Sequence, residues 1–337
     1  MRSGRNPEKE NSKIEIESYH RVILPVYIPN LTEEYFKDGL AILDYCIRSL
    51  LKTIHAKTRI SIVNNGSCGE VSDYLAKLYS EEPSIDQLLH VKNNLGKINA
   101  VYSVVKSNLE PIITVSDADV MFLPNWQYEV EKILHEIPEA GMVSPTPFST
   151  LYKRSDMKST YYYAFFRSKL KTHPVINPEG QQNFEKSIGR EMFKKIHLER
   201  YIILDSGKAK AVLGCGHFVA TYKSRVFEMA PQQVCEYKIG PKAMPQYIDL
   251  PNDKAGLLRL ATLGNHAYHL GNRSEPWMGE ELDRINTSET DNSRMFQSFP
   301  VRSLNGFQRF IGGLVYRILV IKMNRIFLKR LGLPKNY

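Results

Sequence analysis

Residues 111–119 read Pro-Ile-Ile-Thr-Val-Ser-Asp-Ala-Asp, an apolar run that ends in two aspartates separated by one alanine. A short run of this composition between polar segments is typical of a buried strand. Residues 120–126 are again mostly apolar, so Asp117 and Asp119 are expected at the edge of a sheet. Because side chains two residues apart on an extended chain point to the same side, both carboxylates are predicted to face one ligand.

The chain before this pair alternates between strand and helix patterns. We expect helices at residues 40–54, 71–79 and 98–107, and strands at residues 21–28, 58–63, 88–91 and 111–115. Such alternation predicts an α/β fold with a mainly parallel sheet and crossover helices. In sheets of this kind, ligands gather at the carboxyl ends of the strands. The two aspartates are predicted to lie at that edge.

The chain after the pair is less regular. Residues 150–210 are rich in aromatic and basic residues and are interpreted as an insertion. A helix followed by a strand is expected within residues 257–270, and a helix within residues 307–333. We therefore divide the chain into a polar N-terminal segment (1–20), one large domain (21–275) and a basic helical extension (276–337).

The formal net charge of +9 is concentrated at the C-terminal end. Residues 302–337 contain no Asp or Glu and the following basic residues: Arg302, Arg309, Arg317, Lys322, Arg325, Lys329, Arg330 and Lys335. The rest of the chain is nearly neutral, which argues against a nucleic-acid partner. A helix over residues 307–333 could pack on the domain or lie on an anionic membrane, and the lack of acidic residues favours the membrane.

The cysteines and the N-terminal segment bear on the compartment. Four cysteines are present without C-x-x-C pairs or metal-site spacing, which favours a reducing environment. Residues 1–20 lack the apolar run of a secretory signal, and no stretch of about 18 uncharged apolar residues occurs. We expect a cytoplasmic protein that can associate with the inner face of the membrane.

Asp117 and Asp119 are suited to one divalent cation. Carboxylate oxygens are preferred ligands of Mg²⁺ and Mn²⁺, and such an ion can neutralise a departing diphosphate. The structural alternative is an Asx turn that caps the strand. The position of the pair at a predicted sheet edge favours the metal site.

The order of these segments resembles that of the GT-A fold glycosyltransferases, in particular the large inverting group called family 2. The resemblance covers about residues 21–272 and depends on several short segments in order. They are Val22-Ile23-Leu24-Pro25-Val26-Tyr27, Val63-Asn64-Asn65-Gly66-Ser67, Asn94-Leu95-Gly96-Lys97, Asp117-Ala118-Asp119, Gly214-Cys215-Gly216, Asn252-Asp253 with Arg259, and His269. The resemblance implies transfer of a sugar, with inversion, from a nucleoside diphosphate sugar to a glycan or lipid-linked acceptor.

For the donor, the resemblance implies contacts to the base and ribose from Pro25, Tyr27, Asn64 and Ser67, which follow the first two strands. It implies contact of Lys97 with the diphosphate, and of Asp117 with the ribose-diphosphate region and the metal. A UDP-sugar is favoured. Asn64 stands where the family usually has an Asp that accepts the uracil proton, and its amide oxygen can also accept. A plain tight turn at Asn64 and a solvated Lys97 are the structural alternatives.

For catalysis, the resemblance implies Asp253 as the general base. Asn252-Asp253 with Arg259 is similar to the family's E-D-x-x-L-x-x-R segment, with Asn in place of Glu and Gly256 in place of Leu. In an inverting transfer, one carboxylate takes the proton of the attacking hydroxyl. Asp253 also suits a helix N-cap, and Asp249 is a second candidate base.

The remaining candidates concern the metal and the acceptor. His269 is similar to the histidine that completes metal coordination in some GT-A enzymes, and neutral imidazole suits manganese. Gly214 and Gly216 are expected to let an acceptor sugar approach the backbone. Trp126 could stack on a sugar, or be buried beneath the sheet.

Two other functions were weighed. Sugar-phosphate nucleotidyltransferases use a similar fold and metal, but they open with a Gly-rich G-x-G-T-R loop, and residues 21–30 contain no glycine. A sugar-binding relative without catalysis would be indicated by loss of the metal pair or of Asp253, and both are present. The sequence therefore favours a glycosyltransferase.

Overall fold

In the computed structural model, which describes residues 4, 6, 13–240, 243–286 and 295–337, ten strands form one sheet in the order β3-β2-β1-β4-β10-β6-β11-β9-β8-β7. Their bounds are β1 His20–Val26, β2 Thr58–Asn65, β3 Ile85–Val91, β4 Ile112–Ser116, β6 Ala140–Ser144, β7 Lys169–Pro174, β8 Arg200–Asp205, β9 Lys210–Leu213, β10 Val219–Lys223 and β11 Leu258–Ala261. Two further strands, β5 (Val120–Phe122) and β12 (Ala267–His269), pair separately.

The sheet is parallel where the sequence alternates between strand and helix. β3, β2, β1 and β4 are parallel neighbours, and β6 is parallel to β11. β10 lies antiparallel between β4 and β6. Successive residues of β1 face opposite sides: Leu24 belongs to one core cluster and Ile23 to the other. The predicted α/β fold class is confirmed.

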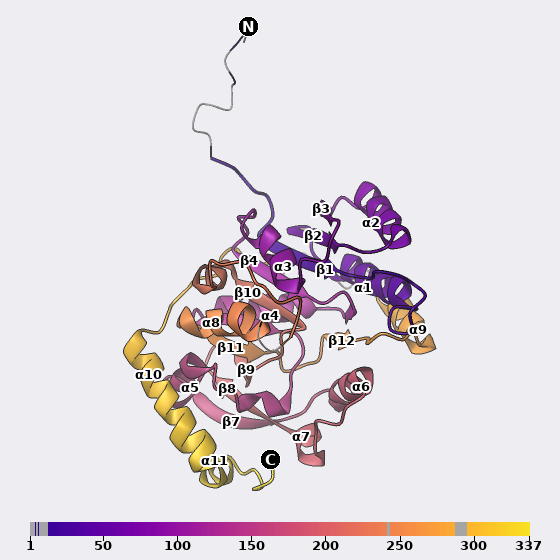
Figure 1. Cartoon of the computed structure of the whole chain (residues 1–337). Coiled ribbons are helices and arrows are strands. Elements are labelled where there is room, and N and C mark those ends of the chain that lie inside the picture. The colour runs from indigo at the N-terminus through magenta and orange to yellow at the C-terminus, as the bar shows by residue number, and fades with distance from the viewer. Residues whose placement is uncertain (1–3, 5, 7–12, 241–242, 287–294) are drawn as a thin grey trace.

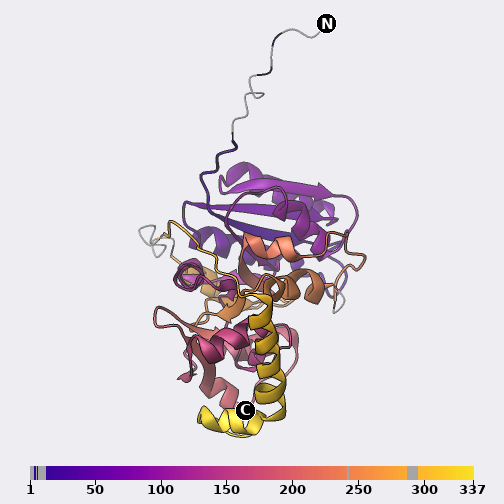
Figure 2. The same cartoon turned by 90° about the vertical axis from the view of Figure 1, so that its left-hand side faces the viewer.

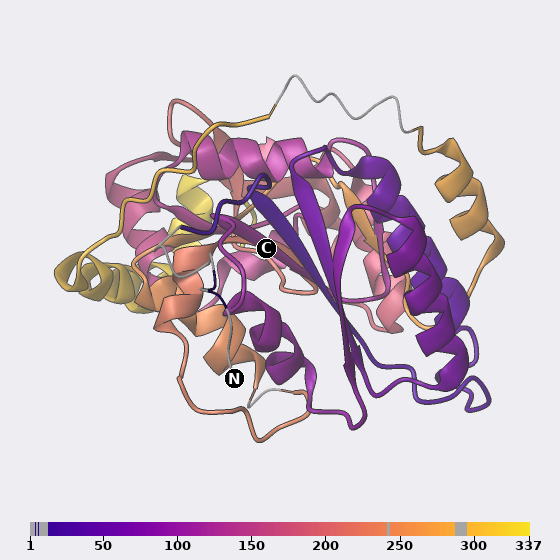
Figure 3. The same ribbon diagram turned by 90° about the horizontal axis from the view of Figure 1, so that it is seen from above.

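Helices cover both faces of this sheet, as the view from above shows (Figure 3). On one face lie α1 (Gly39–Thr53), α2 (Gly69–Glu81) and α4 (Trp126–Glu136), which bury their apolar sides in the first cluster. On the other face lies α3 (Lys97–Val105), which buries Val101 and Val104, and α8 (Leu250–Lys254) lies nearby. The amphipathic spacing seen in the sequence is thus used to sandwich the sheet.

The segment interpreted as an insertion continues the main sheet. It contains α5 (Lys158–Phe166), α6 (Pro178–Ile188) and α7 (Lys195–Glu199), together with β7 and β8. β7 pairs with β8 and β8 with β9, all antiparallel. These elements form the lower part of the molecule in Figure 1. The proposed domain limits themselves stay a prediction.

The helix expected at the start of residues 257–270 is wrong. This segment forms β11 and then β12, with only loop between them. β11 is buried along its whole length between β6 and β9. A strand buried on both faces does not alternate between apolar and polar residues, so its pattern is easily mistaken for that of a helix.

The C-terminal region is helical, as predicted. α9 (Pro276–Arg284) packs on α1, with Met278 and Leu282 against Ile42. α10 (Gly306–Val315), a π-helical stretch (Tyr316–Lys322) and α11 (Asn324–Arg330) follow, and run down one side of the molecule (Figure 2). Among the described residues, no helix has both the length and the apolar character needed to cross a membrane.

Candidate functional site

Asp117 and Asp119 lie in the loop between β4 and β5 and not on an extended strand. β4 ends at Ser116, and the backbone N–H of Asp117 donates to the carbonyl of Phe218 at 2.7 Å. Phe218 directly precedes β10, the antiparallel neighbour of β4. The carboxylates are about one-third exposed, at 30% and 32%. Sheet pairing therefore brings both to the edge of the sheet, as the sequence predicted.

His269 lies beside Asp119 because β12 pairs with β5, in a register that places His269 opposite Val120. Its Nε2 lies 3.5 Å from Oδ2 of Asp119, and its Nδ1 lies 2.9 Å from the hydroxyl of Ser187. Oδ1 of Asp119 is buried and has no hydrogen-bond partner among the described residues. A buried carboxylate oxygen without a partner is costly, so this corner has the character of a cation site.

Lys97 forms an ion pair with the other carboxylate, through Nζ and Oδ1 of Asp117. Lys97 is the first residue of α3, and Gly96 before it has a φ of +82°. A Cβ at Gly96 would lie 2.8 Å from Cα of Lys238, so glycine is needed for this close approach. Burial lowers the pKa of Lys97 to about 8, against the opposing effect of Asp119 and Asp249. The ammonium thus neutralises Asp117.

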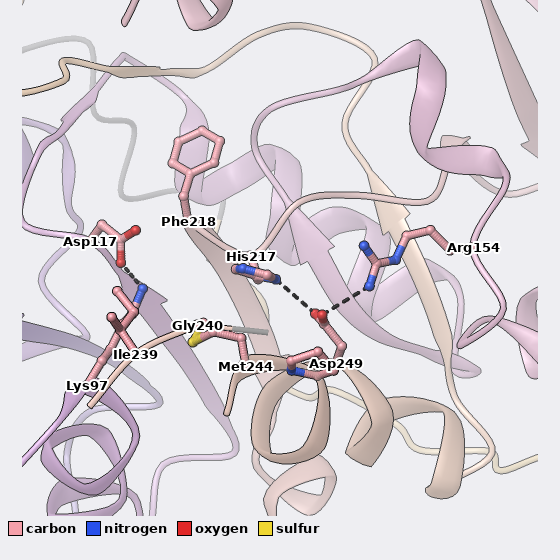
Figure 4. A pocket seen from close by; sticks show the side chains of 10 residues that line it. Lys97, Asp117, Arg154, His217, Phe218, Ile239, Gly240, Met244 and Asp249 are labelled. Atoms are coloured by element: carbon pink, nitrogen blue, oxygen red, sulfur yellow. Dashed lines mark hydrogen bonds and ion pairs between the residues drawn. The ribbon is translucent and has the colours of Figure 1, made fainter. Parts of the chain in front are cut away.

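A cavity of about 440 Å³ opens beside this ion pair. Figure 4 shows Lys97 and Asp117 on one side of it, and His217, Arg154 and Asp249 on the other. The lining residues are Lys97, Asp117, Arg154, His217, Phe218, Ile239, Gly240, Met244, Pro245 and Asp249. A volume of this size suits a small-molecule ligand.

Asp249 occupies the second charged end of the cavity. Its Oδ1 forms an ion pair with Nη1 of Arg259 at 2.9 Å and lies 3.0 Å from Nδ1 of His217. Its Oδ2 accepts from Arg154 at 3.0 Å. The side chain of Asp249 is only 1% exposed, whereas that of His217 is 33% exposed. His217 is therefore the member of this group that a ligand in the cavity can reach.

Two arginines and a histidine around Asp249 control its ionisation. Burial alone would raise the pKa of this carboxyl, but Arg259, His217 and Arg154 together hold it well below its ordinary value. Arg259 is itself fully buried, and its Nε donates to the carbonyl of Cys215 at 2.8 Å. Asp249 is thus a permanent anion that orients the imidazole of His217.

Comparison with protein families assigns the chain. The sequence model described as "Glycosyl transferase family 2" matches residues 26–197, just over half of the chain. The chain belongs to this family. A comparison with curated protein sequences found no match.

Solved structures give matches at low similarity. The mannosyltransferase PcManGT of Pyrobaculum calidifontis, in complex with GDP-Man and Mn²⁺, is 14% identical, with a TM-score of 0.40 over 76% of this chain and 58% of that chain. S. aureus TarS 1–349 is 11% identical, with a TM-score of 0.44 over 91% and 74%. GalNAc-T7 with UDP, GalNAc and Mn²⁺ is 12% identical, with a TM-score of 0.44 over 76% and 43%. In a longer TarS structure, the match spans 20% of that chain.

The carboxylate expected as general base of this family 2 chain is placed elsewhere. Asp253 does not line the cavity, and it is 3% exposed. Its Oδ1 accepts from the backbone N–H of Ser159 at 2.7 Å, at the start of α5, and its Oδ2 accepts from Arg309 at 3.2 Å. In this structure Asp253 caps one helix and holds another, whereas Asp249, the second candidate, lies beside the cavity.

The residues expected to bind the base and ribose lie at the ends of β1 and β2 and in the turns that follow these strands, outside the lining of this cavity. Oδ1 of Asn64 accepts from the backbone N–H of Ser67 at 3.1 Å, and its Nδ2 donates to Ser72 at 2.8 Å. The hydroxyl of Ser67 accepts from the N–H of Ile28 at 3.1 Å, which ties the two loops together. Tyr27, after β1, is 41% exposed, and Pro25 lies within β1. Asn64 thus forms the tight turn that was its structural alternative.

The three residues expected to contact the acceptor do not line the cavity. Trp126 is fully buried, and its indole N–H donates to Thr53 at 3.1 Å, so contact with a sugar is excluded in this structure. Gly214 has a φ of +87° and lies against the carbonyl of Leu151, and neither it nor Gly216 lines the cavity. The segment that contains the glycines does reach the cavity, but through His217 and Phe218.

Sequence reasoning missed Arg154 and His217. Arg154 lies in an irregular segment far from any recognised motif, so no signal pointed to it. His217 directly follows the Gly214-Cys215-Gly216 segment, and that position could have suggested a role. Its partner Asp249 was recognised only as a second candidate.

A second group of possible metal ligands lies within the core of the protein, away from the cavity. Ligand atoms of His20, His55 and Glu131 lie within 4.8 Å of one another, and all three residues are buried. Nδ1 of His55 accepts from the backbone N–H of Lys57 at 3.2 Å. Nε2 of the same ring lies 3.0 Å from Glu131. In this structure the cluster is a hydrogen-bond network of the core, and none of its residues lines the cavity.

Proposed function

We propose that this chain is an inverting glycosyltransferase. It would transfer a sugar from a nucleoside diphosphate sugar, with a UDP-sugar favoured, to a hydroxyl of a glycan or lipid-linked acceptor. The observation that carries the proposal is the unpaired, buried Oδ1 of Asp119 beside His269, at the sheet edge of a chain that belongs to family 2. A cation there is what a departing diphosphate requires.

The residues suited to hold Mn²⁺ or Mg²⁺ are Asp119, His269 and Asp117. Two carboxylates and one imidazole fit either ion, and the imidazole favours manganese. The hydroxyl of Ser187 at Nδ1 of His269 fixes the ring so that Nε2 faces Asp119. When bound, the ion supplies positive charge to the departing diphosphate. Lys97, paired with Asp117 in this structure, is placed to turn its ammonium to the phosphates.

For the proton of the acceptor hydroxyl, we propose His217, positioned by Asp249. Both oxygens of Asp249 are already paired with arginines, and its pKa is held low, so it is a poor proton acceptor. Nδ1 of His217 donates to Asp249, which leaves Nε2 to accept. As the hydroxyl oxygen attacks the anomeric carbon, its proton passes to Nε2, and the carboxylate of Asp249 stabilises the imidazolium.

Two alternatives are kept as outcomes of the test. A nucleotidyltransferase would bind a nucleoside triphosphate and release pyrophosphate, and a non-catalytic relative would bind the donor without turnover. A cytoplasmic location belongs to the proposal, because all four cysteines are unpaired and a reducing compartment keeps them so.

The experiment is a thermal-shift screen of UDP, GDP, ADP and the corresponding triphosphates, with and without Mn²⁺. A ligand that binds the folded state raises the midpoint by mass action. We expect one nucleoside diphosphate to stabilise the protein only with the metal, and Asp119→Ala to lose that effect. A shift by triphosphates alone would favour the nucleotidyltransferase. If no nucleotide gives a metal-dependent shift, the proposal is overturned.

Inversion needs its own measurement. Once a donor sugar is found, proton NMR of the first product gives the anomeric configuration. A product with the configuration opposite to that of the donor is expected, because His217 and Asp249 lie across the cavity from Asp117 (Figure 4). A product that retains the configuration would contradict the assignment of a single proton acceptor.

A further inference from the structure

The C-terminal helices have one face fixed on the domain. Gly312 of α10 packs so closely on α5 that an added Cβ would overlap the carbonyl oxygen of Lys158. Arg309 reaches Asp253 at 3.2 Å, and Val315 and Val320 are buried. The capping box of Asn305 begins α10 at a defined residue. The orientation of this helix is therefore set by the domain.

The opposite face of the same helices is apolar and open to solvent. Phe307 is 72% exposed and Phe310 62%, and Ile318, Ile321 and Ile326 are between 45% and 60% exposed. Phe307 and Phe310, three residues apart, share one side of α10, and Ile318 and Ile321 lie in the π-helical stretch that continues it. One set of apolar residues in these helices therefore packs on the domain, and the other faces outward.

Exposed basic side chains lie on the same helices. Arg317, Lys322, Arg325, Lys329 and Arg330 are all exposed, and residues 302–337 contain no acidic residue. Figure 2 shows these helices along the outer surface of the molecule, where no other element covers them. We call this surface, formed by the exposed apolar and basic residues of 307–330, the C-terminal face.

We propose that the C-terminal face binds the surface of an anionic lipid bilayer, an interaction beyond the proposed transfer reaction. Large apolar side chains would enter the boundary between headgroups and acyl chains, and the basic side chains would pair with lipid phosphates. A nucleic acid would not offer an apolar phase for Phe307 and Phe310. A second copy of the chain would set two basic surfaces against each other, and like charges repel. Charge complementarity therefore favours the bilayer.

The test measures cosedimentation of the full chain with vesicles of phosphatidylcholine alone or with phosphatidylglycerol added. We expect binding that needs the anionic lipid and weakens as salt increases. An apolar variant (Phe307→Ser, Phe310→Ser, Ile321→Ser) and a basic variant (Arg317→Gln, Lys322→Gln, Arg325→Gln) should each lower the partition coefficient about tenfold or more.

Matched controls distinguish binding through the C-terminal face from nonspecific binding through apolar or basic residues elsewhere on the protein. The apolar control replaces three exposed residues elsewhere, Tyr79→Ser, Leu109→Ser and Ile176→Ser, which are 47%, 59% and 52% exposed. The basic control replaces the exposed lysines Lys77, Lys106 and Lys208 with Gln. Both controls should bind vesicles as the unchanged protein does. Equal losses in test and control variants would overturn the proposal.

Two further readouts keep the result interpretable. Circular dichroism and the thermal midpoint show whether each variant is folded. The metal-dependent nucleotide shift shows whether the donor site is intact. The membrane proposal can therefore fail while the proposed function stands. Light scattering gives the mass in solution. A concentration-dependent dimer that the apolar variant abolishes, with no vesicle binding by the unchanged protein, would show that the face binds a second copy instead.

Discussion

Nε2 of His269 lies 3.5 Å from Oδ2 of Asp119, although 150 positions separate them in the chain. The contact depends on the pairing of β5 with β12, which places His269 opposite Val120. Ser187, from α6, fixes the other ring nitrogen at 2.9 Å. Three separate segments therefore meet at the proposed cation site.

The first prediction concerns this site. Asp119→Ala and His269→Ala should each abolish the metal-dependent thermal shift by nucleotide, because each removes a proposed ligand. Ser187→Ala should weaken Mn²⁺ binding by about tenfold, as expected for loss of a partner that orients a ligating histidine. Titration with Mn²⁺ checks both. Unchanged metal affinity in the His269 variant would remove this residue from the site.

The second prediction concerns proton transfer. His217→Gln should lower the transfer rate by about 100-fold or more, as is usual for loss of a general base, and should leave nucleotide binding intact. The transfer rate per folded molecule and the metal-dependent nucleotide shift, measured on the same samples, check this. An unchanged transfer rate in the His217→Gln variant would move the role to Asp249.

The third prediction distinguishes Asp253 from Asp249. Asp253→Asn should lower the free energy of unfolding by about 1–3 kcal/mol, because it weakens hydrogen bonds to Ser159 and Arg309. Its transfer rate per folded molecule should be unchanged. Chemical denaturation and a transfer assay on the same samples check this. A stable variant without transfer activity would restore Asp253 as the base.

The fourth prediction uses the low pKa of Asp249. A carboxyl with a lowered pKa in the folded state stabilises the protein above its unfolded pKa of about 3.9, and this stability is lost as the pH falls below that value. Denaturation curves between pH 7 and pH 3 should therefore show a steep loss at the acid end. Asp249→Asn should be less stable near pH 7, since it leaves Arg259 and Arg154 without their partner. Its stability should also depend less on pH below about 4.

The fifth prediction concerns the docking of α10. Gly312→Ala should destabilise the protein by about 1–3 kcal/mol, because the new methyl group would overlap the backbone of Lys158. Gly313→Ala is the matched control: its Cβ would meet only the side chain of Lys158, at 3.6 Å. Alanine favours a helix by about 1 kcal/mol over glycine, so the control should be neutral or more stable. Urea denaturation of both variants decides.

Much of the fold was predictable because local patterns agree with the tertiary structure. The parallel half, from β1 to β4, follows the expected strands and helices closely, since crossover helices there have clear amphipathic spacing. β11 was missed because it is buried on both faces, and burial of this kind is a property of the whole sheet. No local pattern reveals it.

The site was predictable only in part, for a similar reason. Asp117, Asp119 and Lys97 lie at the ends of predicted elements, so their meeting follows from the order of the parallel strands. Asp249 and Asp253 lie one helical turn apart in or beside α8, and no local pattern shows which of them faces the cavity. Their partners Arg154 and Arg309 come from distant segments, and these contacts decide where each carboxylate lies.

The hydrogen bond from the N–H of Asp117 to the carbonyl of Phe218 has a mechanical consequence. It ties the loop that carries the proposed metal ligands to the strand that begins beside His217, so the spacing between the proposed leaving group and the proposed proton acceptor is set by the pairing of β4 with β10. A substitution in the surrounding loops can then change the shape of the cavity without changing that spacing.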